Sequence, residues 1–216
     1  MFYSTGMESR LRFGDVVQGF ISVNSTINTP IRAIQKERIN INIDMAPLSI
    51  VISPCCSIEK ENIALIPLIK LNNMWFSNPF FYQDFTRMNR PMDIENAIPP
   101  PVWESLPDEE KIRRRREHEG YANIEFFIYE KNDLFQPYQI NLPKKFDHLP
   151  DKQFETQYYM IDFRNIHKIN CESLVNPQAP EGCKVLQLSV ETRAELRNKL
   201  AFYFHRIPQE DRIHED

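Results

Sequence analysis

The segment 38–44, Arg-Ile-Asn-Ile-Asn-Ile-Asp, alternates strictly between isoleucine and polar residues, and it constrains the fold more than any other stretch. Its isoleucines fall on one side of an extended chain and its asparagines fall on the other. Alternation with a period of two is typical of a strand that is buried on one face only. The sequence therefore predicts a protein that is rich in strands.

Runs of β-branched and aromatic residues predict five further strands, at 13–23, 48–53, 62–69, 122–130 and 157–169. The first of these starts with a turn signal, Gly14-Asp15. Pro67 cannot donate a ladder hydrogen bond, so it places the third strand at a sheet edge or near that strand's own end. The last strand is long, and we expect a break in it near Arg164.

Residues 190–207 carry the strongest helical pattern in the chain. Ser189 is a suitable N-cap, Glu191 lies in the first turn, and Pro208 ends the pattern. The apolar face of this helix consists of Leu196, Leu200, Tyr203, Phe204 and Ile207. We expect this helix to pack on the strands and to close the fold.

The order of these elements predicts an α+β, mainly β protein, with a small, partly open barrel and one C-terminal helix. We expect one domain over 1–216, with barrel strands from 13–69 and 122–169. Residues 70–121 form a long insertion, and the helix 190–207 follows the barrel.

Composition narrows the function classes. The chain has 216 residues with 5 glycines and 16 prolines, which argues against a glycine-rich phosphate loop and favours extended connections. A net charge of −4 provides no general attraction to nucleic acid or to anionic lipid. No apolar run reaches the length of a membrane span, and the first twelve residues lack a signal-peptide core. We expect a cytoplasmic protein without a cofactor, whose four cysteines are reduced.

Three segments together resemble the MazF/PemK family of toxin-like small barrels. Gly14-Asp15-Val16-Val17 resembles the family's opening strand. Residues 47–53 and 63–68 are similar to its Arg-Pro-x-Leu-Val-Leu-Ser strand and to the strand that follows. Residues 162–169 and 186–196 are similar to its closing strand, its short Leu-Ser step and its C-terminal helix. The resemblance covers about half of the chain and implies an SH3-like barrel.

The resemblance also implies metal-independent cleavage of single-stranded RNA in the toxin members, and it suggests a homodimer. Their chemistry uses an arginine before the proline of the second segment and a threonine or serine after the next strand. Here Ala46 precedes Pro47, and Ile69-Lys70 follows Leu68, so both positions are unmatched. Because the cleavage needs a cation on the phosphate and a group that moves a proton, this chain is expected to be a non-catalytic relative.

Arg164 and His167 are the candidate catalytic residues if the chain is an enzyme. They lie three residues apart at a strand end, and Asp162 shares the face of Arg164. Such a group could bind phosphate or perform acid–base chemistry. The alternative is an ion pair beside a histidine of the barrel rim.

Arg113, Arg114, Arg115 and Arg116 form the strongest basic cluster, in a predicted polar helix over 107–119. They could grip a phosphate backbone or dock a protein. The alternative is a helix whose arginines pair with neighbouring glutamates four residues away.

The aromatic stretch 75–85 begins with Trp75 and Phe76, which could stack on bases or line a protein groove. The alternative is a loop that its own rings pin to the body of the protein.

Adjacent Cys55 and Cys56 follow a strand directly, where a thiol could act as a nucleophile. With Cys171, Cys183 and His167 they could also hold zinc, although the spacing fits no zinc pattern. The alternative is a pair of small apolar side chains, and we expect no metal.

Three functions follow from these observations. The first is a non-catalytic module of a bacterial toxin–antitoxin or antiviral-defence system, which binds RNA or another protein of the same operon. The second is an endoribonuclease that acts on single-stranded RNA. The third is a cysteine- or zinc-dependent activity at Cys55 and Cys56.

Overall fold

A computed structural model of the chain describes residues 1–19, 22–25, 41–44, 46–54, 58, 62–73, 75, 89, 96, 98, 100–117, 125–142, 153–170 and 184–205. The chain divides into two compact units. The five-stranded unit comprises Tyr3–Ile69 and Asn165–Leu188. The three-stranded unit comprises Met1–Phe2, Lys70–Arg164 and Ser189–Asp216. Whether these units fold as the single predicted domain stays a prediction.

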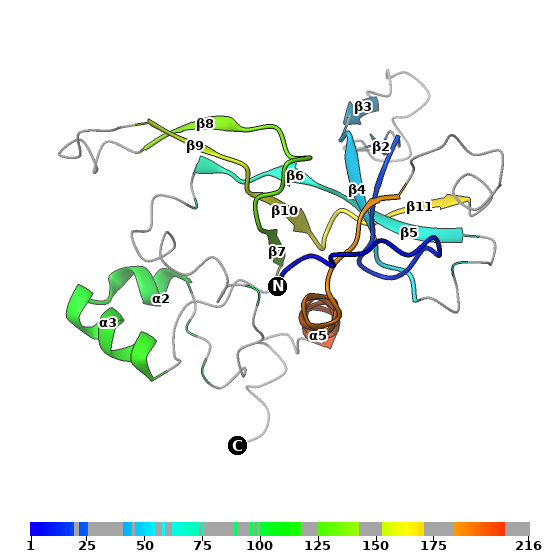
Figure 1. Cartoon of the computed structure of the whole chain (residues 1–216). Helices are drawn as coiled ribbons and strands as arrows, with labels where there is room; N and C mark the ends of the chain where they lie inside the picture. Colours follow the sequence, from blue (N-terminus) through cyan, green and yellow to red (C-terminus); the bar gives the residue numbers. More distant parts are fainter. Residues whose placement is uncertain are drawn as a thin grey trace, which may run out of the picture. The chain divides into compact units, whose positions relative to one another are not determined.

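An antiparallel sheet forms the centre of the five-stranded unit (Figure 1). Its order is β11 (His167–Asn170), β5 (Asn62–Pro67), β4 (Leu48–Val51), β1 (Val16–Gln18) and β12 (Lys184–Leu186). Every residue of β4 is buried, as its apolar sequence predicts. One hydrophobic cluster in the core of this unit contains Val17, Val51, Ile58, Ile63 and Leu65, with Leu11 and Ile169 packed against it.

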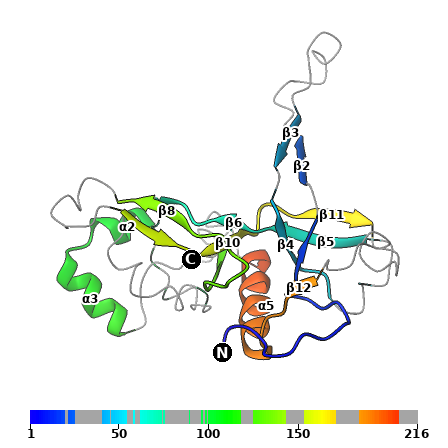
Figure 2. The same cartoon turned by 45° about the horizontal axis from the view of Figure 1, so that its top comes forward.

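The predicted strand 13–23 is wrong as one continuous element, because Gly19 separates β1 from β2 (Ser22–Ser25). Gly19 has a φ of 93°, a conformation that side chains of L-residues rarely adopt. β2 pairs with β3 (Ile41–Asp44), which lies within the predicted strand 38–44. These two strands form a separate ribbon that extends away from β1 and β4 (Figure 2).

The three-stranded unit contains a sheet in the order β6 (Ile69–Lys70), β10 (Tyr159–Asp162) and β7 (Phe126–Tyr129). The predicted break near Arg164 is confirmed, because β10 ends at Asp162 and β11 begins at His167. A second pair, β8 (Tyr138–Asn141) and β9 (Gln153–Thr156), was not predicted. The largest fully buried side chains of this unit include Phe127, Tyr129, Phe135, Ile161 and Phe163.

Three helices are described in this same unit, and they are α2 (Pro100–Ser105), α3 (Asp108–Arg116) and α5 (Val190–His205). Ser189 caps α5 as predicted, since its Oγ accepts a hydrogen bond from the Thr192 amide at 3.2 Å. Leu196 is fully buried, whereas Phe204 is 60% exposed and does not belong to the packed face. Ile207 and the end of the predicted helix lie outside the described residues.

The α+β, strand-rich class is therefore confirmed. The described strands form open antiparallel sheets, and no closed barrel is present among them. Pro67 ends β5, which lies inside the sheet, so the expectation that this proline marks a strand end is confirmed. In the part of the chain that the structure describes, no helix combines the length and the apolar character needed to cross a membrane.

Candidate functional site

Arg164 is held by two carboxylates in the three-stranded unit. Its Nε donates to Asp162 Oδ1 at 2.9 Å, and its Nη2 donates to Oδ2 at 2.7 Å. Its Nη1 lies 3.3 Å from Glu125 Oε2. The hydrogen bonds that Arg164 donates to Asp162 raise the pKa of Arg164 above its ordinary value, so this side chain is a fixed cation.

Sheet register explains why these groups meet. Asp162 lies opposite Phe126 in the β10–β7 pair, and the Phe163 amide continues the pairing to the Glu125 carbonyl at 2.8 Å. The Arg164 guanidinium carbon lies 5.2 Å from the centre of the Phe126 ring. The arginine therefore has an aromatic ring beneath it and carboxylates along its hydrogen-bonding edge.

Trp75 contacts the same phenylalanine, edge to face, with ring centres 4.8 Å apart. The structure thus brings together two predicted residues, Trp75 from the insertion and Arg164 from the strand end, around one ring that the sequence did not single out. We call Trp75, Glu125, Phe126, Asp162 and Arg164 the Arg164 cluster. Phe76 lies outside the described residues.

His167 belongs to the other unit, where it starts β11 and pairs with Leu65. Its Nε2 atom is buried and has no hydrogen-bond partner among the described residues. Of the predicted Asp162, Arg164 and His167 group, the structure joins the first two in an ion pair. This arrangement is the ion-pair alternative that the sequence left open.

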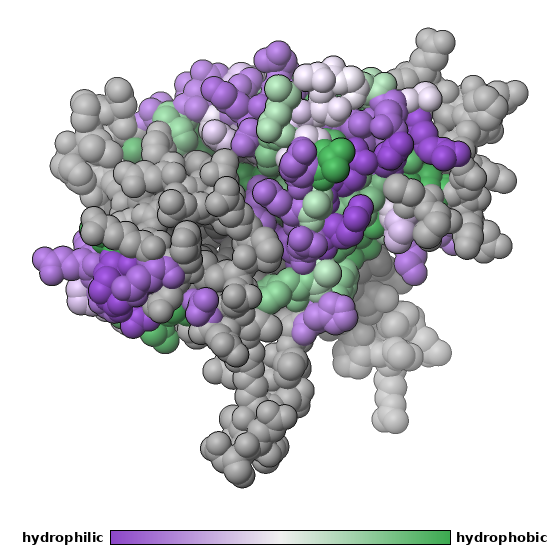
Figure 3. Space-filling view, turned by 60° about the horizontal axis from the view of Figure 1, so that its bottom comes forward, coloured by the Kyte–Doolittle hydropathy of each residue, from purple (hydrophilic) through white to green (hydrophobic). Residues whose placement is uncertain are grey.

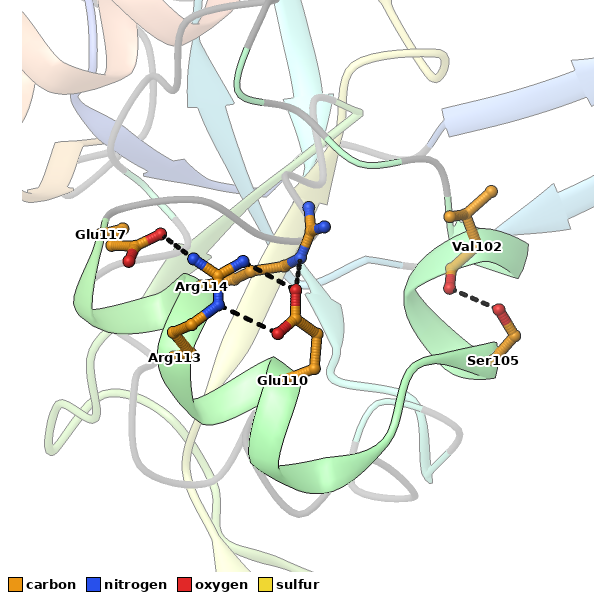
Figure 4. Close-up of polar contacts among 6 residues, drawn as sticks. All are labelled: Val102, Ser105, Glu110, Arg113, Arg114 and Glu117. Carbon is orange, nitrogen blue, oxygen red and sulfur yellow. Dashed lines mark hydrogen bonds and ion pairs between the residues drawn. The ribbon is translucent and has the colours of Figure 1, made fainter.

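The arginines of α3 pair with glutamates of the same segment (Figure 4). Glu110 accepts hydrogen bonds from Arg113 Nη2 and from Arg114 Nε, each at 2.7 Å. Arg113 Nη1 also donates to Glu117 at 2.5 Å. The Arg113 and Arg114 hydrogen bonds lower the pKa of Glu110 to about 2, so this carboxylate stays charged near neutral pH.

The α3 segment is consequently hydrophilic but nearly neutral. Residues 108–117 contain five basic and four acidic side chains. Strongly hydrophilic side chains gather over α3 at the left of the space-filling view (Figure 3). The side chains of Arg115 and Arg116 lie outside what the structure describes, so their predicted role stays a prediction.

Cys55, Cys56, Cys171 and Cys183 all lie outside the described residues, and the proposed thiol and zinc sites stay untested. Within the described ranges, no group of three or more histidine, cysteine, aspartate or glutamate side chains is arranged to hold a metal ion.

Sequence reasoning missed a buried ion pair in the five-stranded unit. Asp15 is fully buried, and its Oδ2 lies 2.7 Å from Lys184 Nζ. The same ammonium donates to Gln187 Oε1 at 2.8 Å and to the Arg10 carbonyl at 3.0 Å. The sequence places Asp15 in a turn signal and in the segment that resembles the family's opening strand, and nothing in the sequence near Lys184 indicates its partner.

Asn89 is a second residue that the sequence did not single out. Its side chain is 2% exposed, its Nδ2 donates to the Ile128 carbonyl at 2.6 Å, and its Oδ1 accepts from the Ile128 amide at 2.7 Å. The side-chain amide thereby takes the place of a neighbouring strand beside β7. One residue of the insertion is thus fixed to the sheet.

Comparison of the chain with protein-family models, with curated proteins and with solved structures finds no match.

Proposed function

We propose that this chain is a non-catalytic interaction module on a MazF/PemK-like, SH3-like barrel, and that it binds another protein of a bacterial toxin–antitoxin or antiviral-defence system. One observation carries the proposal. The described arginines that could have held RNA, namely Arg113, Arg114 and Arg164, are all paired with carboxylates.

Pairing matters because proteins gain most of their affinity for nucleic acid by placing cations on phosphates. Arg113 would have to exchange Glu110 and Glu117 for a phosphate, and Arg164 would have to exchange Asp162. The chain's net charge of −4 also repels the negatively charged phosphates of RNA. A protein surface that presents both signs of charge is the better complement to these segments.

The residues at the two positions that the family's toxins use for catalysis support the proposal of a non-catalytic role. Ala46 offers only a methyl group before β4. Lys70 Nζ lies 4.9 Å from the centre of the Tyr138 ring, a packed cation–π contact within the three-stranded unit. Neither arrangement provides a cation together with a proton-transferring group for RNA cleavage.

The barrel frame is supported by strand adjacency. The segments that resemble the family, β1, β4 and β5, are successive neighbours in one antiparallel sheet, and β11 pairs with β5. Antiparallel neighbours within one sheet are the units from which a small barrel is built.

The test combines two measurements on the full chain. Each protein encoded beside its gene is co-expressed with it, and complexes are measured by size-exclusion chromatography with light scattering. In parallel, fluorescein-labelled single-stranded RNA is incubated with the chain. We expect a stoichiometric protein complex, intact RNA, and RNA binding no tighter than about 10 μM at physiological salt. RNA cleavage that is lost in His167→Ala would overturn the proposal and favour the endoribonuclease.

A further inference from the structure

The solvent-exposed side of α5 carries a regular row of residues. Val190, Ala194, Arg197, Ala201 and Phe204 are all exposed, and successive members lie four, three, four and three positions apart. This spacing is the heptad repeat by which one helix packs along another. We call these five residues the α5 row.

Large apolar side chains lie at both ends of the α5 row. Val190 is 75% exposed and Phe204 is 60% exposed, whereas Leu196 on the opposite side of the helix is fully buried. The Phe204 ring contacts the ring of its neighbour Tyr203, with ring centres 5.2 Å apart. A helix side that faces only water is typically polar, so the α5 row is typical of a surface that another helix covers.

We propose that the α5 row is the contact surface of a homodimer, in which the α5 helices of two copies of the chain pack antiparallel. A two-fold axis relates the helices, so each contact occurs twice. The alanines of the row allow the two helix axes to approach to about 8 Å, the short end of the usual range. This dimer needs only the chain itself and does not depend on the partner protein proposed above.

The second copy is the occupant because the row is complementary to itself in size. When the two helices are centred on position 199, Phe204 lies over Ala194 of the second copy. In the same register Arg197 lies over Ala201 of the second copy. The aliphatic stem of the arginine then packs on a methyl group while its guanidinium stays in water. A large side chain thus meets a small one at each of these contacts.

Charges beside the α5 row favour the same register. Glu191 and His205 are exposed and lie along one flank of the row, near its two ends. In an antiparallel pair this flank faces itself, so the Glu191 carboxylate accepts a hydrogen bond from His205 of the second copy. A register shifted toward the start of α5 pairs Val190 with Ala201, but it leaves Phe204 beyond the other helix and separates Glu191 from His205.

Sedimentation velocity on the full chain, at concentrations up to about 500 μM, measures this association. A contact between two helices of this length buries less than about 1,200 Å² in total, so we expect a weak dimer with a Kd of about 10–100 μM. Phe204→Ser should raise the Kd at least about tenfold. Ile112→Ser is the matched control, because it removes an exposed apolar side chain from α3, and it should leave the Kd unchanged.

An exchange of charges tests the direction of the helices. Glu191→Lys and His205→Glu should each raise the Kd by at least about threefold, because each removes the favourable pair. The double variant places opposite charges together only if the helices are antiparallel, and its Kd should return to within about twofold of wild type. In a parallel pair it would leave like charges opposed. Far-UV circular dichroism establishes that each variant is folded.

A wild-type chain that stays monomeric over the whole concentration range would overturn the inference, whether or not any variant folds. Association that Phe204→Ser leaves unchanged would show that the dimer forms elsewhere. A double variant that associates no more tightly than the weaker single variant would rule out the antiparallel pair.

Discussion

The Lys184 ammonium lies 2.7 Å from the carboxylate of Asp15, and that carboxylate is fully buried. The three protons of the ammonium have three acceptors, on Asp15, Gln187 and Arg10. The pair therefore fastens the turn before β1 to the edge strand β12. Because every donor is used, its role is structural.

Removal of one partner of this pair should destabilise the chain. Lys184→Met leaves the buried Asp15 carboxylate without its counter-ion, and we expect the free energy of unfolding to fall by about 3–5 kcal/mol. Urea denaturation measures this change. Lys168→Met, at an exposed position of β11, is the control and should change stability by less than about 0.5 kcal/mol. A similar loss in both variants would contradict the buried-pair account.

Asn89 should be sensitive to substitution because its amide serves both backbone groups of Ile128. Asn89→Ala leaves a buried N–H and a buried C=O without their partner, and we expect a loss of about 2–4 kcal/mol in urea denaturation. Asn89→Asp keeps an acceptor for the amide but loses the donor to the carbonyl, so it should not restore stability. Asn198→Ala, at an exposed position on α5, should have little effect. If Asn89→Ala is equally mild, the contact does not hold the insertion.

Lys199 should make stability depend on pH. Burial lowers the pKa of Lys199 from its ordinary 10.5 to about 7. Between these pH values the unfolded chain binds a proton that the folded chain has released, so the free energy of unfolding rises with pH. The slope is at most about 1.4 kcal/mol per pH unit, and it vanishes below pH 7, where both states are protonated.

Thermal and urea unfolding from pH 6 to 10 measure this slope. Lys199→Met should flatten this slope and should raise stability at pH 7, because the folded state then no longer buries an ammonium at position 199. Lys131→Met removes an exposed lysine of the same unit and should leave the slope as it is in wild type. An unchanged slope in Lys199→Met would show that another group titrates.

Glu110 should control whether α3 binds nucleic acid. Glu110→Gln removes the carboxylate shared by Arg113 and Arg114, so Arg113 keeps only Glu117, Arg114 loses one carboxylate partner, and both become more accessible to phosphates. We expect tighter binding of single-stranded RNA and a salt dependence that is steeper by about one phosphate contact. Fluorescence anisotropy over a range of salt concentrations measures both quantities.

Glu109→Gln is the matched control for this prediction, because it makes the same change of charge at the adjacent exposed position. Its effect on RNA binding should be smaller, and both variants should remain within about 0.5 kcal/mol of wild-type stability. Equal effects of the two substitutions would indicate a general change of charge and would contradict a specific role for Glu110.

Local features were the most predictable from sequence. The Ser189 cap, the break near Arg164 and the pairing of α3 arginines with glutamates depend on residues within a few positions of one another. The interactions that stabilise these features join residues close together in the sequence, so the spacing of the residue types is enough to predict them. The identity of β4 as a buried strand followed from its continuous apolar run.

Long-range features were the least predictable. Lys184 and Asp15 lie at opposite ends of the sequence, and Asn89 reaches β7 from the insertion 70–121. Neither contact has a local pattern, because tertiary packing alone brings the partners together. β8 and β9 both alternate between apolar and polar residues, but each has only four residues, the shortest run in which alternation indicates a strand.

The sheet of the five-stranded unit also has a consequence for synthesis on the ribosome. β1, β4 and β5 emerge early, but β12, which covers the open side of β1, ends at Leu186. At elongation rates of about 5–20 residues per second, the nascent chain waits on the order of 10 s between β5 and β12. During that interval the backbone groups of β1 that will pair with β12 are available to other chains. Production of this protein should therefore benefit from slower initiation, lower temperature or a chaperone that shields nascent strands.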